Sequence, residues 1–417
     1  MNNAVQKYLA GYAEPEAKIL DKLLNSTLEN PISSIQTYQN CLVIPAFQES
    51  YRDLIKAWGQ LPDDTLIILV INSPIEEDIP TIALYEEFQS NSTTQHLVAN
   101  LHLLTRNSDK DVLLVDRCHD ENLIPKAQGV GLARKIGADI ALALIGKGLI
   151  VEPRISLTDA DVALPEDYFT PTMAPDDAAL VYPFIHHSSN DMADTIQRYE
   201  ISMLYYVAGL KWSGSHYGFT TIGSLITVNP EHYARVRGFP KRDAAEDFYL
   251  LNKLAKTGTI RSIETPVIEI EARRSTRVPF GTGPALTKII EGGIEEYRFY
   301  HPMVFQELRT FLDNFSALWS VSNVRDLYQS SPFIHRYCEE SEFYSSIESR
   351  KEKIKSKPVF DKFLVDWFDG FRTLKFIHKM REHYPSVAIE NITDAPFIAE
   401  HHSLTQLREQ LARLCMD

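Results

Sequence analysis

The sequence predicts an α/β fold in which a mostly parallel sheet is flanked by helices and is followed by a helical C-terminal region. Three observations lead to this prediction. The chain has 417 residues and 44% hydrophobic content, enough for a sizeable core. Between residues 41 and 157, continuous β-branched and leucine-rich runs alternate with helix-like stretches, which is typical of buried parallel strands. Aromatic residues then recur at helical spacing over residues 360–374.

Four apolar runs indicate the strands. They cover residues 41–44, 65–71, 111–115 and 148–157. Three helix-like stretches lie between them, over residues 50–60, 81–89 and 130–145. Polar residues follow three of the strands, in the segments 45–49, 72–74 and 159–161. Because ligands bind beyond the carboxyl ends of strands in such sheets, we expect these segments to meet in one crevice.

The pattern divides the chain into three parts. Residues 1–38 look helical and are expected to pack on the outside of the main domain. Residues 39–285 form the α/β domain that carries the motifs described below. Residues 286–417 form a helical C-terminal domain, whose aromatic stripe is expected to be core.

Composition limits the partners and the compartment. The formal net charge of −14 argues against a nucleic-acid partner, which needs a positive surface. We see no secretory signal and no transmembrane segment, so a cytoplasmic protein is expected. The four cysteines have no metal-type spacing, and Cys118-His119-Asp120 lacks the second half of a zinc motif. The oligomeric state is left open.

An Asp-x-Asp pattern follows the fourth apolar run. Asp159 and Asp161 lie where a strand is expected to end. Two carboxylates there can hold a hard divalent cation, Mg²⁺ or Mn²⁺, beside a phosphorylated ligand. The alternative interpretation is an ordinary turn, in which Asp-x-Asp is common.

A second acidic pair begins a helix-like stretch. Glu246 and Asp247 precede Phe248, Leu250 and Leu251. The helix dipole by itself favours carboxylates at this position. The functional alternative is a general base that removes a proton from an attacking hydroxyl.

Basic residues are candidates for contacts with a diphosphate. Arg273, Arg274 and Arg277 precede a Gly/Pro-rich loop, and guanidinium groups bind phosphate in a bidentate manner. Arg134 follows Gly129 and Gly131, which lack the third glycine of a dinucleotide fingerprint. We therefore reject a dinucleotide site and keep Arg134 as a source of positive charge.

The order of these motifs resembles that of family-2-type glycosyltransferases with the GT-A fold. Residues 43–49 resemble their opening strand and loop, and residues 131–139 resemble their "A-R-N-x-G" helix. Residues 157–161 look like their metal-binding motif, and residues 223–240 are similar to an acceptor-side segment. Glu246-Asp247 follows at the expected place, and together the motifs span residues 41–285.

The resemblance implies a nucleoside-diphosphate sugar as donor. The nucleotide pocket would be lined by Pro45, Ala46 and Glu49, with Asn72 near the base or ribose. Asp159 and its neighbour Ala160 would contact the donor sugar nucleotide.

The resemblance also implies the reaction, a metal-dependent hexosyl transfer to an unidentified hydroxyl acceptor. Asp161 would be the main ligand of a Mn or Mg ion, and Asp159 would be shared between ion and ribose. Asp247 would be the base of an inverting displacement, and Glu246 would support the acceptor. Arg134 and the three arginines of residues 273–277 would steady the diphosphate.

Two alternatives remain open from the sequence. A phosphohydrolase of the haloacid-dehalogenase type also has Asp-x-Asp after an apolar strand and would use Asp159 as its nucleophile. A non-catalytic scaffold that binds a partner is the other alternative, although the retained acidic pairs count against it.

Overall fold

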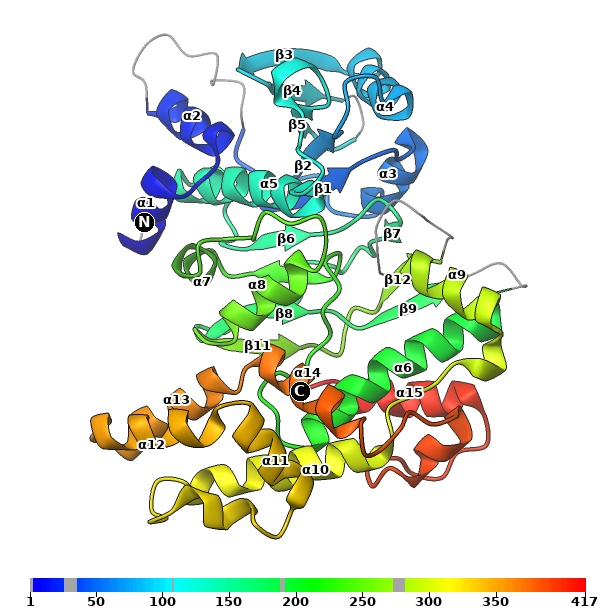
Figure 1. Ribbon diagram of the computed structural model, residues 1–417. Coiled ribbons are helices and arrows are strands. Elements are labelled where there is room, and N and C mark those ends of the chain that lie inside the picture. The colour runs from blue at the N-terminus through cyan, green and yellow to red at the C-terminus, as the bar shows by residue number, and fades with distance from the viewer. Residues whose placement is uncertain (1–2, 26–35, 107–108, 188–191, 273–281) are drawn as a thin grey trace. The chain divides into compact units, whose positions relative to one another are not determined.

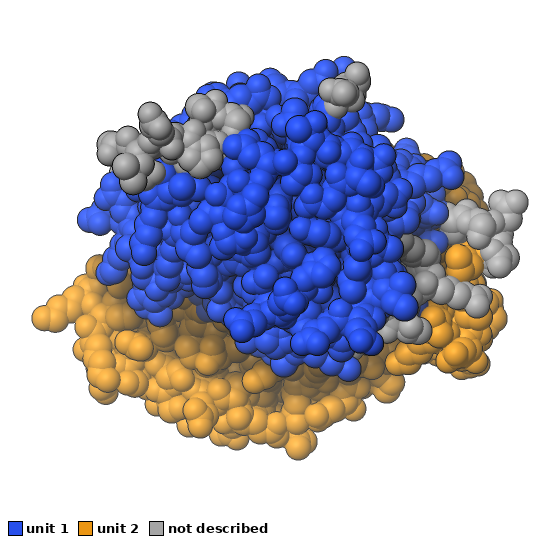
Figure 2. Space-filling model, turned by 90° about the horizontal axis from the view of Figure 1, so that it is seen from above, with its two compact units in different colours: residues 1–189, 221–284, 417 blue, residues 190–220, 285–416 orange. Residues whose placement is uncertain are grey.

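The computed structural model describes residues 3–25, 36–106, 109–187, 192–272 and 282–417 (Figure 1). The chain forms two compact units, which are coloured separately in Figure 2. Unit 1 holds residues 1–189, 221–284 and 417, and unit 2 holds residues 190–220 and 285–416. The three-part division drawn from the sequence stays a prediction.

A nine-stranded sheet forms the centre of unit 1. In spatial order its strands are β11 (Thr259–Ser262), β8 (Asp177–Val181), β10 (Ile226–Val228), β6 (Ile155–Leu157), β1 (Asn40–Ala46), β2 (Thr65–Asn72), β5 (Val112–Arg117), β4 (Leu101–Thr105) and β3 (Thr93–Val98). Strands β10 and β4 run against their neighbours, whereas the other strands share one direction. The predicted mixed α/β class with a mostly parallel sheet is confirmed.

The four predicted strands are the middle of this sheet. They correspond to β1, β2, β5 and β6, which lie side by side and are all parallel. Every residue of β2 is buried, because both faces of the sheet are covered. That coverage explains why these strands appear in the sequence as unbroken apolar runs rather than as alternating patterns.

Helix α5 (Gly129–Gly146) lies between the sheet and the N-terminal helices. It packs on β1 and β2, and α1 (Asn3–Gly11) and α2 (Pro15–Leu24) pack on it (Figure 1). Its residues 131–144 are all buried, and they include the charged residues Arg134, Lys135 and Asp139. Gly137 permits the close approach, since a Cβ there would come within 2.4 Å of Val43 Cγ1.

Further elements complete unit 1. The predicted helices at residues 50–60 and 81–89 are α3 (Tyr51–Trp58) and α4 (Ile79–Ser90), and the Ser50 side chain caps α3 by accepting from Asp53 N–H at 3.1 Å. A second sheet has the order β7 (Val162–Ala163), β12 (Ile268–Glu271), β9 (Phe184–His187). Two short helices follow β10, namely α7 (Pro230–Arg235) and α8 (Glu246–Leu254).

Unit 2 is helical. Its helices are α6 (Ala193–Trp212), α10 (Pro302–Asp313), α11 (Pro332–Glu340), α12 (Phe343–Lys353), α13 (Lys357–Trp367), α14 (Gly370–Met380) and α15 (Leu404–Leu414), while α9 (Thr282–Gly292) spans its boundary. The aromatic stripe is core in part, since Phe360, Leu364 and Phe368 are buried, whereas Phe363, Trp367 and Phe371 are half-buried. The Phe311 ring lies 4.8 Å from the Phe368 ring. Across the described residues, no helix combines the length and the hydrophobicity that a bilayer crossing needs.

Candidate active site

Polar segments meet at the carboxyl edge of the central sheet. Strands β6, β1 and β2 are adjacent and parallel, so their carboxyl ends lie together. Pro45 and Ala46 end β1, Asn72 ends β2, and Asp159 follows β6. These residues therefore share one edge of the sheet, and the crevice in which they are expected to meet stays a prediction.

Arg134 of α5 joins the two acidic segments at this edge. Its Nη2 lies 2.7 Å from Asp159 Oδ1, and its Nε lies 2.9 Å from Glu246 Oε1. Its Nη1 donates to the carbonyl of Gly223 at 2.8 Å. Arg134 is 3% exposed and Glu246 is 4% exposed, so this ion pair is shielded from water. A guanidinium fork can bind two carboxylates from different elements at once.

The backbone is shaped to allow this arrangement. A Cβ at Gly223 would lie 2.7 Å from Arg134 Nη2, so glycine leaves room for the guanidinium. Ala245 adopts a left-handed conformation with φ of 59° immediately before α8. Because left-handed backbone is uncommon outside glycine, this turn marks a constrained position directly ahead of Glu246 and Asp247.

The environment of Asp247 suits proton transfer near neutral pH. Burial and the neighbouring Glu246 carboxylate raise the pKa of Asp247 to about 7, although its Oδ1 accepts from Phe248 N–H at 2.7 Å. Burial also raises the pKa of Glu246, more than Arg134 lowers it. A carboxyl group whose pKa lies near the working pH is well placed to act as a general base.

The charges at this site favour a cation. Among the described residues, the carboxyl groups of Asp159, Glu246 and Asp247 lie around the guanidinium of Arg134. A diphosphate would add further negative charge, so its binding there calls for a divalent cation. Carboxylate oxygens are suitable ligands for Mg²⁺ or Mn²⁺.

The described residues also include Asn72, Glu49, Ala160 and Asp161 among the predicted site residues. In the part of the chain that the structure describes, no hydrogen bond or ion pair links Asn72 to Arg134, Asp159 or Glu246. Glu49 lies in the loop between β1 and α3. Ala160 is buried beside Asp159, and the Asp161 carbonyl accepts from Glu271 N–H at 2.9 Å. The segment of Arg273, Arg274 and Arg277 falls outside the described residues.

One polar cluster was missed in the sequence. Side chains of Asp116, Cys118 and His119 gather at the end of β5, with ligand-type atoms all within 4.8 Å of one another. The sequence interpretation grouped Cys118 and His119 with Asp120 instead. The spacing i, i+2, i+3 directly after a strand was the available signal, and recognising it required knowing where β5 ends.

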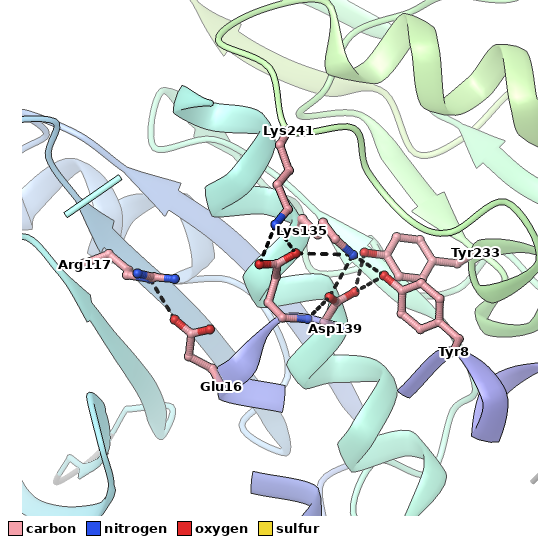
Figure 3. A network of polar contacts seen from close by, with 8 residues as sticks. Tyr8, Glu16, Arg117, Lys135, Asp139, Tyr233 and Lys241 are labelled. Carbon is pink, nitrogen blue, oxygen red and sulfur yellow. Dashed lines mark hydrogen bonds and ion pairs between the residues drawn. The ribbon is translucent and has the colours of Figure 1, made fainter. Parts of the chain in front are cut away.

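A buried network anchors the N-terminal helices beside the site (Figure 3). Asp139 accepts hydrogen bonds from the hydroxyls of Tyr8 and Tyr233, at 2.6 and 2.8 Å, and from the Lys135 ammonium at 3.0 Å. It also accepts from the Glu14 backbone N–H at 2.8 Å. Because Lys135 is the residue after Arg134, the network also holds the turn of α5 that carries the guanidinium.

Comparison with known proteins adds little to this description. No family model matches the chain, and no curated protein matches it in sequence. Among solved structures it is similar to the mannosyltransferase PcManGT from Pyrobaculum calidifontis, in complex with GDP-Man and Mn²⁺. The two are 13% identical, the match covers 90% of this chain and 95% of that one, and the TM-score is 0.36. A TM-score this low does not establish a common fold.

Proposed function

We propose that this chain is a glycosyltransferase of the GT-A, family-2 type, which moves a sugar from a nucleoside-diphosphate sugar to a hydroxyl acceptor. The observation that carries the proposal is the Arg134 bridge between Asp159 and Glu246 at the carboxyl edge of the sheet. It supports the proposal because it brings a strand-end Asp-x-Asp motif next to an acidic pair whose second member, Asp247, has a pKa of about 7. The order of the sequence motifs is the second support.

The donor side of the site is assigned to the strand ends. Pro45, Ala46 and Glu49 would line the nucleotide pocket, and Asn72 would lie near the base or ribose. Asp161 would hold the Mn or Mg ion, while Asp159 stays oriented by Arg134 and faces the ribose and the ion. A bound divalent cation would neutralise the charge that develops on the leaving diphosphate.

The arginines of residues 273–277 are proposed to complete the donor side. Arg273, Arg274 and Arg277 would contact the diphosphate through their guanidinium groups. They would balance the negative charge that Asp159, Glu246 and Asp247 place at the edge of the sheet.

The acceptor side is assigned to α8. Asp247 would take the proton from the acceptor hydroxyl as that oxygen attacks the anomeric carbon, which inverts the configuration there. Glu246, fixed by Arg134 at 2.9 Å, would orient the acceptor. Burial keeps Glu246 away from bulk water, whereas Asp247 is half-buried and its pKa is raised to about 7.

A donor screen tests the proposal directly. The full chain is incubated with nucleotide sugars and Mn²⁺ or Mg²⁺, and sugar release or transfer is measured with and without chelator. We expect metal-dependent turnover of one donor class, inversion at the anomeric proton by NMR, and loss of turnover but retained donor binding in Asp247→Asn. Asp167→Asn, the same exchange at an exposed residue, is the matched control.

Two outcomes would contradict the proposal. Absence of binding and turnover with every nucleotide sugar would exclude a donor site of this kind. Release of phosphate from phosphomonoesters, abolished by Asp159→Asn, would instead favour the phosphohydrolase. Unimpaired turnover in Asp247→Asn would retain the transferase but remove Asp247 as its base.

A further inference from the structure

The end of strand β5 carries a compact cluster of three different metal-binding groups. Asp116 supplies a carboxylate, Cys118 a thiol and His119 an imidazole. Asp116 Oδ1 lies 3.0 Å from His119 Nδ1 and 3.4 Å from Cys118 Sγ, and the sulfur lies 3.4 Å from the same imidazole nitrogen. The three atoms thus form a nearly equilateral triangle.

Those separations match the spacing of ligands around one small cation. Bonds of about 2.0–2.3 Å to a tetrahedral zinc ion place its ligand atoms roughly 3.3–3.7 Å apart. An ion slightly above the plane of the triangle would reach all three atoms with little side-chain movement, and its fourth position would stay open. The hydrogen bonds now made within the cluster would be replaced by bonds to the ion.

The local fold holds the cluster in place. Cys118 N–H donates to Asp116 Oδ1 at 3.0 Å, which folds the chain back as the strand ends. Arg117, which lies between Asp116 and Cys118 in the chain, extends to the opposite side of β5, where it pairs with Glu16 of α2 at 2.7 Å (Figure 3). On the cluster's side, the Tyr85 ring of α4 packs edge-on against His119, with centroids 4.8 Å apart.

The cluster combines burial with access. Cys118 is fully buried, whereas the side chains of Asp116 and His119 are 13% and 33% exposed. An ion could therefore reach the site from the His119 side. Its position is also close to the proposed donor edge, because Asn72 of β2 pairs with Arg117 of β5 in the sheet register.

We infer that Asp116, Cys118 and His119 form a binding site for a borderline-soft divalent cation such as Zn²⁺. Thiolate and imidazole ligands select such ions over Mg²⁺ and Mn²⁺, which prefer oxygen. The site is thus chemically distinct from the carboxylate site proposed around Asp161. It stands on its own contacts and does not depend on the glycosyltransferase proposal.

Cobalt spectroscopy on the full chain tests this inference. After chelator treatment, Co²⁺ is titrated in and the thiolate-to-cobalt charge-transfer band is recorded, and Zn²⁺ affinity is then measured by competition. We expect the band at one ion per chain, its displacement by Zn²⁺, and its loss in Cys118→Ser and His119→Ala. Cys338→Ser, which makes the same exchange at another buried free cysteine, should keep the band.

The variants give clear alternatives. Zn²⁺ affinity should fall more than about 100-fold on removal of either ligand, the upper end of the cost of losing a residue that only orients a ligand. Absence of a band in the parent chain, or a band that persists in Cys118→Ser or in His119→Ala, would overturn the site. Circular dichroism confirms that each variant is folded, and the partly exposed His119 keeps the test valid if Cys118→Ser does not fold. Because a site made of carboxylates gives no thiolate band, failure here leaves the donor site untouched.

Discussion

Replacing Arg134 with methionine should destabilise unit 1 in a pH-dependent way. The guanidinium is 3% exposed and pairs with Glu246 at 2.9 Å and with Asp159 at 2.7 Å. Methionine fills much of the same volume without charge, so Glu246 is left as a buried carboxylate without its cation. Breaking a buried ion pair in this way costs about 3–5 kcal/mol. For a unit of this size, that loss lowers the Tm by roughly 6–20 °C.

The sign of the pH dependence follows from Glu246. Burial already raises its pKa in the folded chain, and removing Arg134 takes away the largest opposing influence, so the pKa rises further. The folded state then keeps a proton that the unfolded chain releases as the pH rises past about 4.3. Stability therefore falls with increasing pH until the folded pKa is passed. The Tm loss should be larger at about pH 8 than at about pH 5.

The assay is thermal denaturation followed by circular dichroism at the two pH values. Arg235→Met removes a partly exposed partner of Glu231 and is the control, with an expected loss of about 0–1 kcal/mol. In Arg134→Met/Glu246→Gln no buried carboxylate is left without a cation, because the Asp159 side chain is 34% exposed and can be hydrated. The double variant should therefore lose less than the sum of the single losses and show little pH dependence. The reasoning is refuted if Arg134→Met behaves like Arg235→Met, or if its loss is equal at both pH values.

Three further predictions concern the same region. Turnover of the proposed reaction should fall about tenfold per pH unit below pH 7, because Asp247, with a pKa of about 7, must be unprotonated to accept the proton. A flat pH–rate profile would exclude Asp247 as the general base. Gly223→Ala should lower the free energy of unfolding by about 1–3 kcal/mol, since the new Cβ would lie 2.7 Å from Arg134. In the control Gly11→Ala the new Cβ meets nothing within 4 Å, and equal Tm values for the two variants would contradict the close packing at Gly223. Asp139→Ala should lower the free energy of unfolding by about 3–5 kcal/mol and expose residues 3–25 to proteolysis, because the donors in Figure 3 lose their acceptor. Unchanged protease resistance would show that the network does not hold the N-terminal helices in place.

The middle of the sheet could be predicted because its strands are buried on both faces. The run 65–71 is apolar throughout and became β2, in which every residue is buried. The hairpin of β3 and β4 was not predicted, because three residues of β3 are exposed and its sequence, with His96 and Gln95, is polar. Strand β10 has three residues, too few to show a period, and β6 occupies only Ile155–Leu157 of the run predicted over residues 148–157.

The candidate site was predictable in part for the same reason. Asp159 follows an apolar strand and Glu246 begins a helix, and both positions can be found from local patterns. Neither pattern shows that Arg134 connects them, because Arg134 is 25 residues from one and 112 from the other. The role of Gly223 also depends on the tertiary structure, since the lack of a Cβ there is needed only because the Arg134 guanidinium packs against it.

The sequence by itself determined the four middle strands of the sheet, the helices between them and the polar residues that end the strands, because burial on both faces and strand-end chemistry are local properties of the chain. The tertiary structure decided which of those residues act together. The crossing of α5 over the sheet sets Arg134 between two carboxylates, and the raised pKa of Asp247 results from that burial and from the adjacent Glu246. The turn after β5 likewise selects Asp116 rather than Asp120 as the partner of Cys118 and His119. These are distances between side chains, and they depend on where the strands end and on how the helices cross the sheet.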